Sequence, residues 1–129
     1  MRLEDNRCCF ACGPDNPRGL RLQFRFEGEH YLTEFEVLPE YQGWAGLAHG
    51  GLLATVLDEV MARLLWEKQI PALAAKMALR YRSPARVGER LRVQGRITGQ
   101  RGRLVFTQAE ALHADGSQVA SAEATYLQV

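Results

Sequence analysis

The chain has 129 residues, of which 47% are hydrophobic, and its formal net charge is +1. This length predicts a single domain, residues 1–129, with a substantial core. The nearly balanced charge gives no reason to expect binding to nucleic acid. Because we find neither an apolar run of membrane length nor a signal-peptide pattern, we expect a cytoplasmic protein with no membrane partner.

Residues 1–19 are a turn-rich N-terminal segment that holds all three cysteines, Cys8, Cys9 and Cys12. The Cys9-x-x-Cys12-Gly13 spacing resembles half of a zinc knuckle, but a closed structural zinc site needs four ligands and no second cysteine pair follows. A site completed between two chains is the alternative. The odd number of cysteines argues against a disulfide framework. We therefore expect reduced thiols, no stoichiometric metal and no cofactor.

Two strands and a loop follow this segment. Apolar and polar residues alternate over residues 20–27 and again over 31–37, and the short connection at 28–30 predicts a hairpin. Pro39 ends the second strand, because proline cannot donate to a strand ladder. Residues 39–48 are predicted to form a loop.

A glycine-containing turn then leads into the one strongly helical segment, predicted over residues 49–68. Pro71 stops the helix. Glu59, Arg63 and Glu67 are spaced four apart and predict a solvated ladder of ion pairs. The residues that recur at helical spacing form a broad apolar face: Leu52, Leu53, Val56, Leu57, Val60, Met61, Leu64 and Leu65.

Gly50 and Gly51 stand at the start of this helix. The first N–H groups of a helix lack intrahelical acceptors, and the helix dipole favours negative charge there. Such a turn can hold a carbonyl oxygen that becomes an oxyanion. The alternative is a tight turn that only caps a core helix.

Asp58 lies on the flank of the apolar face, where no residue of the helix is placed to form an ion pair with it. A carboxylate in such surroundings is a candidate acid, base or nucleophile, and ordinary surface is the alternative. Eight residues of helix put Asp58 about 12 Å from Gly50. Two antiparallel copies of the helix across a two-fold axis would bring Gly50 or Gly51 of one chain to Asp58 of the other. If both groups are catalytic, the enzyme is at least a dimer.

Four more strands are predicted after the helix, at 76–82, 91–98, 104–114 and a last strand up to the C-terminus. The turns between them are at 83–88, 101–103 and 115–116, where Asp115-Gly116 is a strong hairpin signal. The fold class is therefore α+β: one antiparallel sheet of five to six strands wrapped around one long helix. One face of the last strand carries small residues that would let the helix lie close, together with one tyrosine: Ala120, Ala122, Ala124 and Tyr126.

Three motifs, in this order, resemble the PaaI-like hotdog-fold acyl-CoA thioesterase superfamily. The first is residues 9–17 with Gly19-Leu20, the second is residues 42–51 followed by Asp58, and the third is residues 81–85 with Gly88. The resemblance covers nearly the whole chain. It implies a hotdog fold, a homodimer or homotetramer, and hydrolysis of an acyl-CoA to a free acid and CoA.

The resemblance also implies roles for particular residues. The N–H of Gly50 or Gly51 polarises the thioester carbonyl, and Asp58 from the second chain acts as general base or as nucleophile. His49 orients the turn by hydrogen bonds, and Gln42 orients the water or the carbonyl. For Gln42 the alternative is loop surface.

The phosphates of CoA favour arginine near the mouth of the pocket. Arg82 and Arg86 are the best candidates because they flank the turn at 83–88, and the alternative is a basic solvent face. Trp44 is predicted to line the acyl tunnel or to cover the helix.

One position departs from the family pattern. Many relatives carry a serine or threonine on the strand after the helix, which helps to hold the water, and the best-aligned residue here is Ala74. This departure leaves open a non-catalytic acyl-CoA-binding hotdog protein. A hotdog hydratase or dehydratase is a further alternative, although it requires a histidine paired with a carboxylate.

Overall fold

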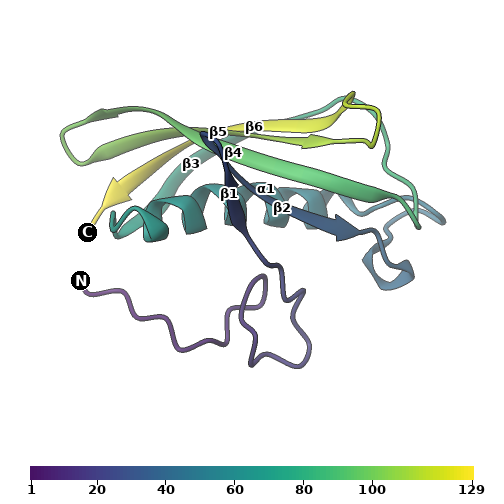
Figure 1. Cartoon of the computed structure of the whole chain (residues 1–129), viewed down its shortest axis with the longest axis horizontal. Coiled ribbons are helices and arrows are strands. Elements are labelled where there is room, and N and C mark those ends of the chain that lie inside the picture. The colour runs from purple at the N-terminus through teal and green to yellow at the C-terminus, as the bar shows by residue number, and fades with distance from the viewer.

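A computed structural model describes all 129 residues, and it is an antiparallel six-stranded sheet wrapped around one long helix (Figure 1). This confirms the predicted α+β class. The strand order in the sheet is β1-β2-β4-β5-β6-β3. In chain order the elements are β1 (Arg25–Glu27), β2 (His30–Glu36), the 3₁₀ helix η1 (Pro39–Tyr41), α1 (Gly50–Glu67), β3 (Ala72–Tyr81), β4 (Arg90–Arg101), β5 (Leu104–Leu112) and β6 (Gln118–Gln128).

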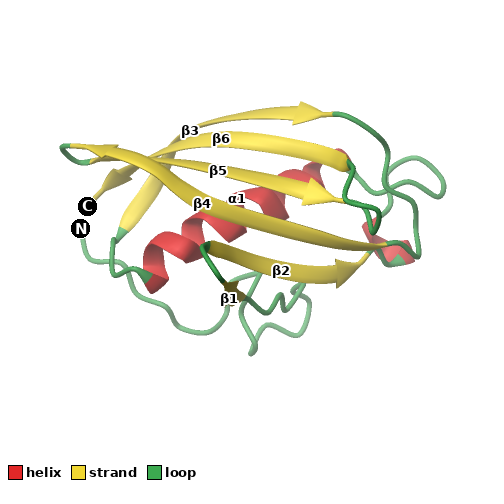
Figure 2. Cartoon of the chain, turned by 45° about the horizontal axis from the view of Figure 1, so that its top comes forward, coloured by secondary structure: helices red, strands yellow, loops and turns green.

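The core lies between α1 and the concave face of the sheet, which the helix crosses obliquely (Figure 2). Two features of the strands let the helix approach closely. Ala120, Ala122 and Ala124 of β6 are buried as predicted, and a Cβ added at Gly95 of β4 would lie 3.3 Å from Val60 Cγ1. The buried residues of α1 are Leu53, Val56, Leu57, Val60, Met61, Leu64 and Leu65.

The helix boundaries are within one residue of the predicted ones. His49 is the N-cap, and Gln69 adopts a left-handed φ of 60° just before Pro71, so the chain leaves the helix there. None of the helices combines the length and the apolar character needed for a bilayer span.

The first predicted strand is wrong over most of its length, because only residues 25–27 of 20–27 are in the sheet. Arg21 has a φ of 53°, which a strand cannot accommodate. The backbone N–H groups of Leu20 and Leu22 donate to the carbonyls of Phe10 and Ala11 instead. Residues 20–24 therefore alternate like a strand but form a loop, which is hydrogen-bonded to the N-terminal segment.

The N-terminal segment runs along the side of α1 that faces away from the sheet (Figure 1). Arg63 reaches it through an ion pair of 2.9 Å with Asp5, and Arg63 also lies 3.6 Å from Glu67. The predicted ladder is therefore wrong at its first step, because Glu59 forms no ion pair with Arg63. Glu59 is half-buried beneath the segment and accepts a hydrogen bond of 3.6 Å from Cys9 Sγ.

Candidate active site

The start of α1 is organised by the imidazole of His49. Its Nδ1 accepts a hydrogen bond of 2.8 Å from the N–H of Gly51, so in the neutral ring the proton is on Nε2. The N–H of Gly51 is thereby occupied. The N–H of Gly50 has no acceptor in the chain, and Gly50 is therefore the glycine whose N–H is available to a ligand.

Two glycines lie against the His49 ring, where any larger residue would crowd it. A Cβ at Gly43 would lie 3.2 Å from His49 Cδ2, and one at Gly51 would lie 3.0 Å from His49 Cε1 and Nδ1. Tyr81, at the end of β3, donates its hydroxyl to the Gly50 carbonyl at 2.8 Å. These contacts fix the direction in which the Gly50 N–H points.

Gln42 supports the loop that precedes the helix. Its Oε1 accepts the N–H of Gly46 at 2.8 Å, and Gly46 has a φ of +81° that favours glycine. The carbonyl oxygen of the Gln42 side chain is therefore engaged in the loop. Only its amide NH₂ group is left to contact a ligand.

The loop at 42–48 is joined by its backbone to the turn between β3 and β4. The N–H of Ala48 donates to Ala85, and the N–H of Val87 donates to Gly46. These bonds place the loop that contains Trp44 and the turn that contains Arg86 side by side near the N-terminus of α1. Both side chains are exposed, and Trp44 at 84% exposure covers neither the helix nor a tunnel within one chain.

Arg82 is in a different setting from Arg86. It lines a hollow on the outer face of the sheet together with Arg80 and Glu123. Arg82 and Arg86 flank the same turn in the sequence, but in the structure they lie in different surroundings.

Asp58, in the middle of α1, is half-buried and is held by Tyr126 of β6. The phenol hydroxyl donates to Asp58 Oδ1 at 2.6 Å and lies 3.1 Å from the Asp58 carbonyl oxygen. Burial, followed by the charge and the hydrogen bond of Asp58, raises the pKa of Tyr126 far above its usual range. Tyr126 therefore remains a donor, and Asp58 Oδ2 is the carboxylate oxygen free for a reaction.

From the sequence, Tyr126 is expected only on the strand face that packs on the helix, whereas in the structure its hydroxyl contacts the candidate site residue Asp58. Its place opposite Asp58 depends on how β6 lies over the helix, and no local pattern encodes that. Ala74 of β3, the position at which the family resemblance implies a serine or threonine, is the direct cross-strand partner of Tyr126. Tyr126 is thus on the strand next to this position.

A second polar cluster, also missed, ties the turn at 83–89 to the β5–β6 hairpin. Ser83 Oγ lies 2.8 Å from His113 Nε2, and His113 Nδ1 lies 2.6 Å from Glu89 Oε1. This is the order of a nucleophile, a base and a carboxylate. However, the Ser83 hydroxyl donates to the carbonyl of Gln118 at 2.7 Å, so its proton is not directed at the imidazole. The hydrogen bonds of this cluster stabilise the turn at 83–89.

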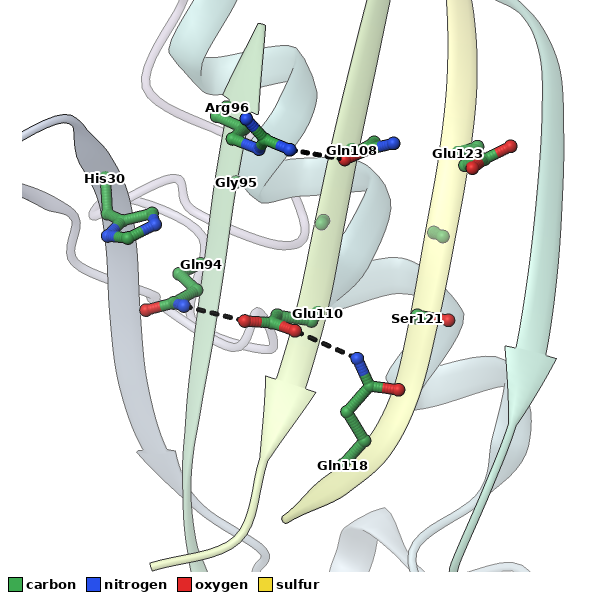
Figure 3. A pocket seen from close by; sticks show the side chains of 11 residues that line it. His30, Gln94, Gly95, Arg96, Gln108, Glu110, Gln118, Ser121 and Glu123 are labelled. Atoms are coloured by element: carbon green, nitrogen blue, oxygen red, sulfur yellow. Dashed lines mark hydrogen bonds between the residues drawn. The ribbon is translucent and has the colours of Figure 1, made fainter. Parts of the chain in front are cut away.

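The outer face of the sheet carries a polar hollow of about 290 Å³, with the helix behind it (Figure 3). Gln94 and Gln118 donate to the two carboxylate oxygens of Glu110 at 2.8 and 2.9 Å. Arg96 donates to Gln108 at 3.0 Å. These five side chains are hydrogen-bonded among themselves, and the sheet separates the hollow from α1. It is therefore not part of the site around Asp58.

Comparisons with known proteins agree with this fold. Residues 45–120 match the family model described as the thioesterase superfamily. The chain is 33% identical over 81 residues to acyl-coenzyme A thioesterase 13 of Homo sapiens, an alignment that covers 61% of this chain and 58% of that protein. The chain thus spans little more than half the length of the curated relatives it matches.

Solved structures share the whole architecture. A thioesterase superfamily protein superposes with a TM-score of 0.88 at 24% identity, covering 94% of this chain and 63% of that one. A hypothetical thioesterase protein with coenzyme A from Streptococcus pneumoniae gives 0.78 at 16% identity, covering 84% and 88%. A mutant of the phenylacetic acid degradation protein PaaI from Thermus thermophilus gives 0.75 at 22% identity, covering 84% and 93%. The chain therefore belongs to the thioesterase superfamily and has the PaaI-like hotdog fold.

Proposed function

We propose that this protein is an acyl-CoA thioesterase, which hydrolyses an acyl-CoA thioester to a free carboxylic acid and CoA. Membership of the thioesterase superfamily supports this activity, and so does the likeness to acyl-coenzyme A thioesterase 13. The structural neighbour that contains coenzyme A supports the substrate class. The observation that carries the proposal is the half-buried Asp58 carboxylate, which Tyr126 holds by one oxygen.

In this mechanism the N–H of Gly50 binds the thioester carbonyl oxygen. Asp58 of the partner subunit takes a proton from water through Oδ2, and the resulting hydroxide adds to the carbonyl carbon. The oxyanion of the tetrahedral intermediate is stabilised by the Gly50 N–H at the positive end of the helix dipole. Collapse of the intermediate breaks the C–S bond, and the departing thiolate receives the proton. Direct attack by the carboxylate, followed by hydrolysis of the anhydride, uses the same groups.

The active site is proposed to lie between two chains. Within one chain Gly50 and Asp58 are on the same helix, about 12 Å apart, and cannot act on one carbonyl. Strand β3 supports a dimer, because it lies at an edge of the sheet and exposes apolar residues such as Leu73, which is 43% exposed. An open apolar edge is usually covered in the folded assembly. A homotetramer would form from two such dimers.

His49 and Gln42 have supporting roles in this proposal. His49 fixes the turn through its bond to the Gly51 N–H, so that Gly51 is a structural residue and Gly50 is the oxyanion donor. Gln42 holds the loop by its carbonyl oxygen, and its amide NH₂ group is proposed to contact the substrate or the water. Arg86 and Trp44, beside the helix N-terminus, are proposed to contact CoA, and Arg82 is the weaker candidate.

A hydratase or dehydratase is less well supported, because His49 uses Nδ1 for the Gly51 N–H and no carboxylate is hydrogen-bonded to it. The acyl-CoA-binding alternative remains because of Ala74. The Tyr126 hydroxyl, on the strand beside Ala74, is the group proposed to serve in place of the missing one.

The test is to incubate the purified protein with a panel of acyl-CoAs and to measure free CoA thiol and acyl-CoA binding in parallel. Catalytic release of CoA from at least one chain length is the expected result. Binding without release would establish the acyl-CoA-binding alternative. Hydration of a 2-enoyl-CoA without thiol release would establish the hydratase.

A further inference from the structure

Cys9, Cys12 and Glu59 converge on the side of α1 that faces away from the sheet. One ligand atom from each lies within 4.8 Å of the others, and all three residues are half-buried. The two cysteines come from the N-terminal segment, and Glu59 comes from the middle of the helix. This cluster is separate from the proposed hydrolytic site, because Glu59 and Asp58 point from the helix in directions about 100° apart.

The backbone around the cysteines has the form of a metal knuckle. The N–H of Ala11 donates to Cys9 Sγ at 3.4 Å, which stabilises negative charge on the sulfur, and the N–H of Gly13 donates to the Cys9 carbonyl at 2.8 Å. A Cβ at Gly13 would lie 2.4 Å from Cys9 N, so only glycine allows this turn. The spacing of two cysteines across two residues is that of paired zinc ligands.

The cluster itself contains no cationic side chain. Glu59 forms no ion pair, and the guanidinium of Arg63 is bound to Asp5 and Glu67. A divalent ion would neutralise the negative charge that two thiolates and one carboxylate bring together within 4.8 Å.

The distances suit such an ion. With Zn–S near 2.3 Å and Zn–O near 2.1 Å, tetrahedral coordination separates a sulfur and an oxygen ligand by about 3.6 Å. Cys9 Sγ and Glu59 Oε1 are 3.6 Å apart. We propose that Cys9, Cys12 and Glu59 bind a thiophilic divalent cation such as Zn²⁺, with water as the fourth ligand.

Such an ion would fasten the N-terminal segment to α1. The cysteine motif alone shows only two ligands and predicts no stoichiometric metal. The third ligand, Glu59, lies 47 residues further along the chain than Cys12, and its spacing in the helix predicts an ion pair with Arg63 that the structure does not contain. The proposal is independent of the hydrolytic activity.

The test uses the full chain, purified under reducing conditions and stripped of metal with a chelator. Titration with Co²⁺ should produce the intense ultraviolet absorption of thiolate-to-cobalt charge transfer, saturating at one ion per chain and displaced by Zn²⁺. Cys9→Ser and Cys12→Ser should abolish this absorption. Glu59→Gln should weaken Co²⁺ binding by at least about tenfold. Cys8→Ser is the matched control, because Cys8 is exposed and outside the cluster.

Absence of the charge-transfer absorption in the reduced parent protein would overturn the proposal. So would a Cys8→Ser variant that loses as much binding as Cys9→Ser, or a Glu59→Gln variant that binds Co²⁺ as tightly as the parent. Glu59→Gln keeps both cysteines, so its result stands even if a cysteine variant fails to fold. A second readout is the melting temperature, which Zn²⁺ should raise in the parent more than in Glu59→Gln.

Discussion

At the scale of single residues, the proposed catalytic group is the carboxylate oxygen Oδ2 of Asp58, which Tyr126 leaves free. Asp58→Asn keeps the shape of the side chain and removes the charge needed to accept a proton or to attack. We expect thioester turnover to fall by about 10²-fold or more, the effect of losing an acid–base group. Folding, assembly and CoA affinity should change little. The measurement is kcat and KM for the best acyl-CoA of the panel.

Glu67→Gln is the control for this variant, because Glu67 is an exposed carboxylate on the same helix whose ion pair with Arg63 contributes only tenths of a kcal/mol. It should hydrolyse at the parent rate. If Asp58→Asn also hydrolyses at close to the parent rate, Asp58 is not the base, and the acyl-CoA-binding alternative gains support.

Tyr126 is predicted to position Asp58. Tyr126→Phe removes the hydroxyl but keeps the buried ring, so Asp58 Oδ1 loses its donor. A hydrogen bond to a charged group contributes roughly 1.5–3 kcal/mol, and the free energy of unfolding should fall by an amount of that order. A lower kcat with nearly unchanged KM is expected, since the carboxylate is misdirected while the CoA contacts remain. An unchanged kcat in a destabilised variant would mean that the bond is only structural.

At the scale of elements, the turn at 83–89 predicts a pH dependence of stability. Burial raises the pKa of Glu89, but the N–H of Arg86 and the His113 ring outweigh this effect, so the pKa is lowered overall. A lowered pKa stabilises the fold above the unfolded value of about 4.3, and the stabilisation is lost as the pH falls through the lower folded value. Glu89→Gln should therefore be less stable than the parent at pH 7.

The difference in unfolding free energy between the parent and Glu89→Gln should shrink when urea unfolding is repeated at about pH 3. Glu123→Gln is the matched control, because Glu123 is exposed and forms no ion pair. A difference that stays constant between the two pH values would contradict the linkage to Glu89.

Elements with a strong local signal were predictable from the sequence. The helical spacing of the apolar residues, together with Pro71, predicts both ends of α1 to within one residue. Asp115-Gly116 predicts the position of the last hairpin. Residues 20–24 alternate like a strand, but tertiary bonds to the N-terminal segment and the left-handed Arg21 decide their conformation. Local pattern carries no information about such bonds.

The same limit applies to the site. His49, Gly50 and Asp58 follow one another along a single motif, and their types and spacing point to them. Tyr126, 68 residues beyond Asp58, and Glu59, beside the cysteines, join the two proposed sites only through packing. From the sequence alone, such residues are predicted to belong to the core or to the surface.

At the scale of the whole molecule, the separation of Gly50 and Asp58 along one helix predicts an obligate oligomer. Sedimentation should find a dimer or tetramer under assay conditions. Leu73→Lys places a charge on the exposed edge of β3 and should weaken assembly and activity together, because charged residues block pairing at sheet edges. Leu104→Lys is the control. Leu104 is exposed, but its strand β5 is paired on both sides, so this substitution should change neither assembly nor activity. An active monomer would contradict the shared site.

The position of β3 in the sheet has a consequence for how the protein is made. β3 follows α1 directly in the chain, yet its only partner within the chain is β6, the last of the six strands to be synthesised. On the ribosome, β3 must therefore wait, with both edges open, until β4, β5 and β6 have emerged. Pairings between distant segments form slowly, and open strands aggregate in the meantime. Because Tyr126 also lies on β6, the hydrogen bond that holds Asp58 forms only in this same final step. In the proposed mechanism, hydrolysis therefore cannot begin before β6 is in place.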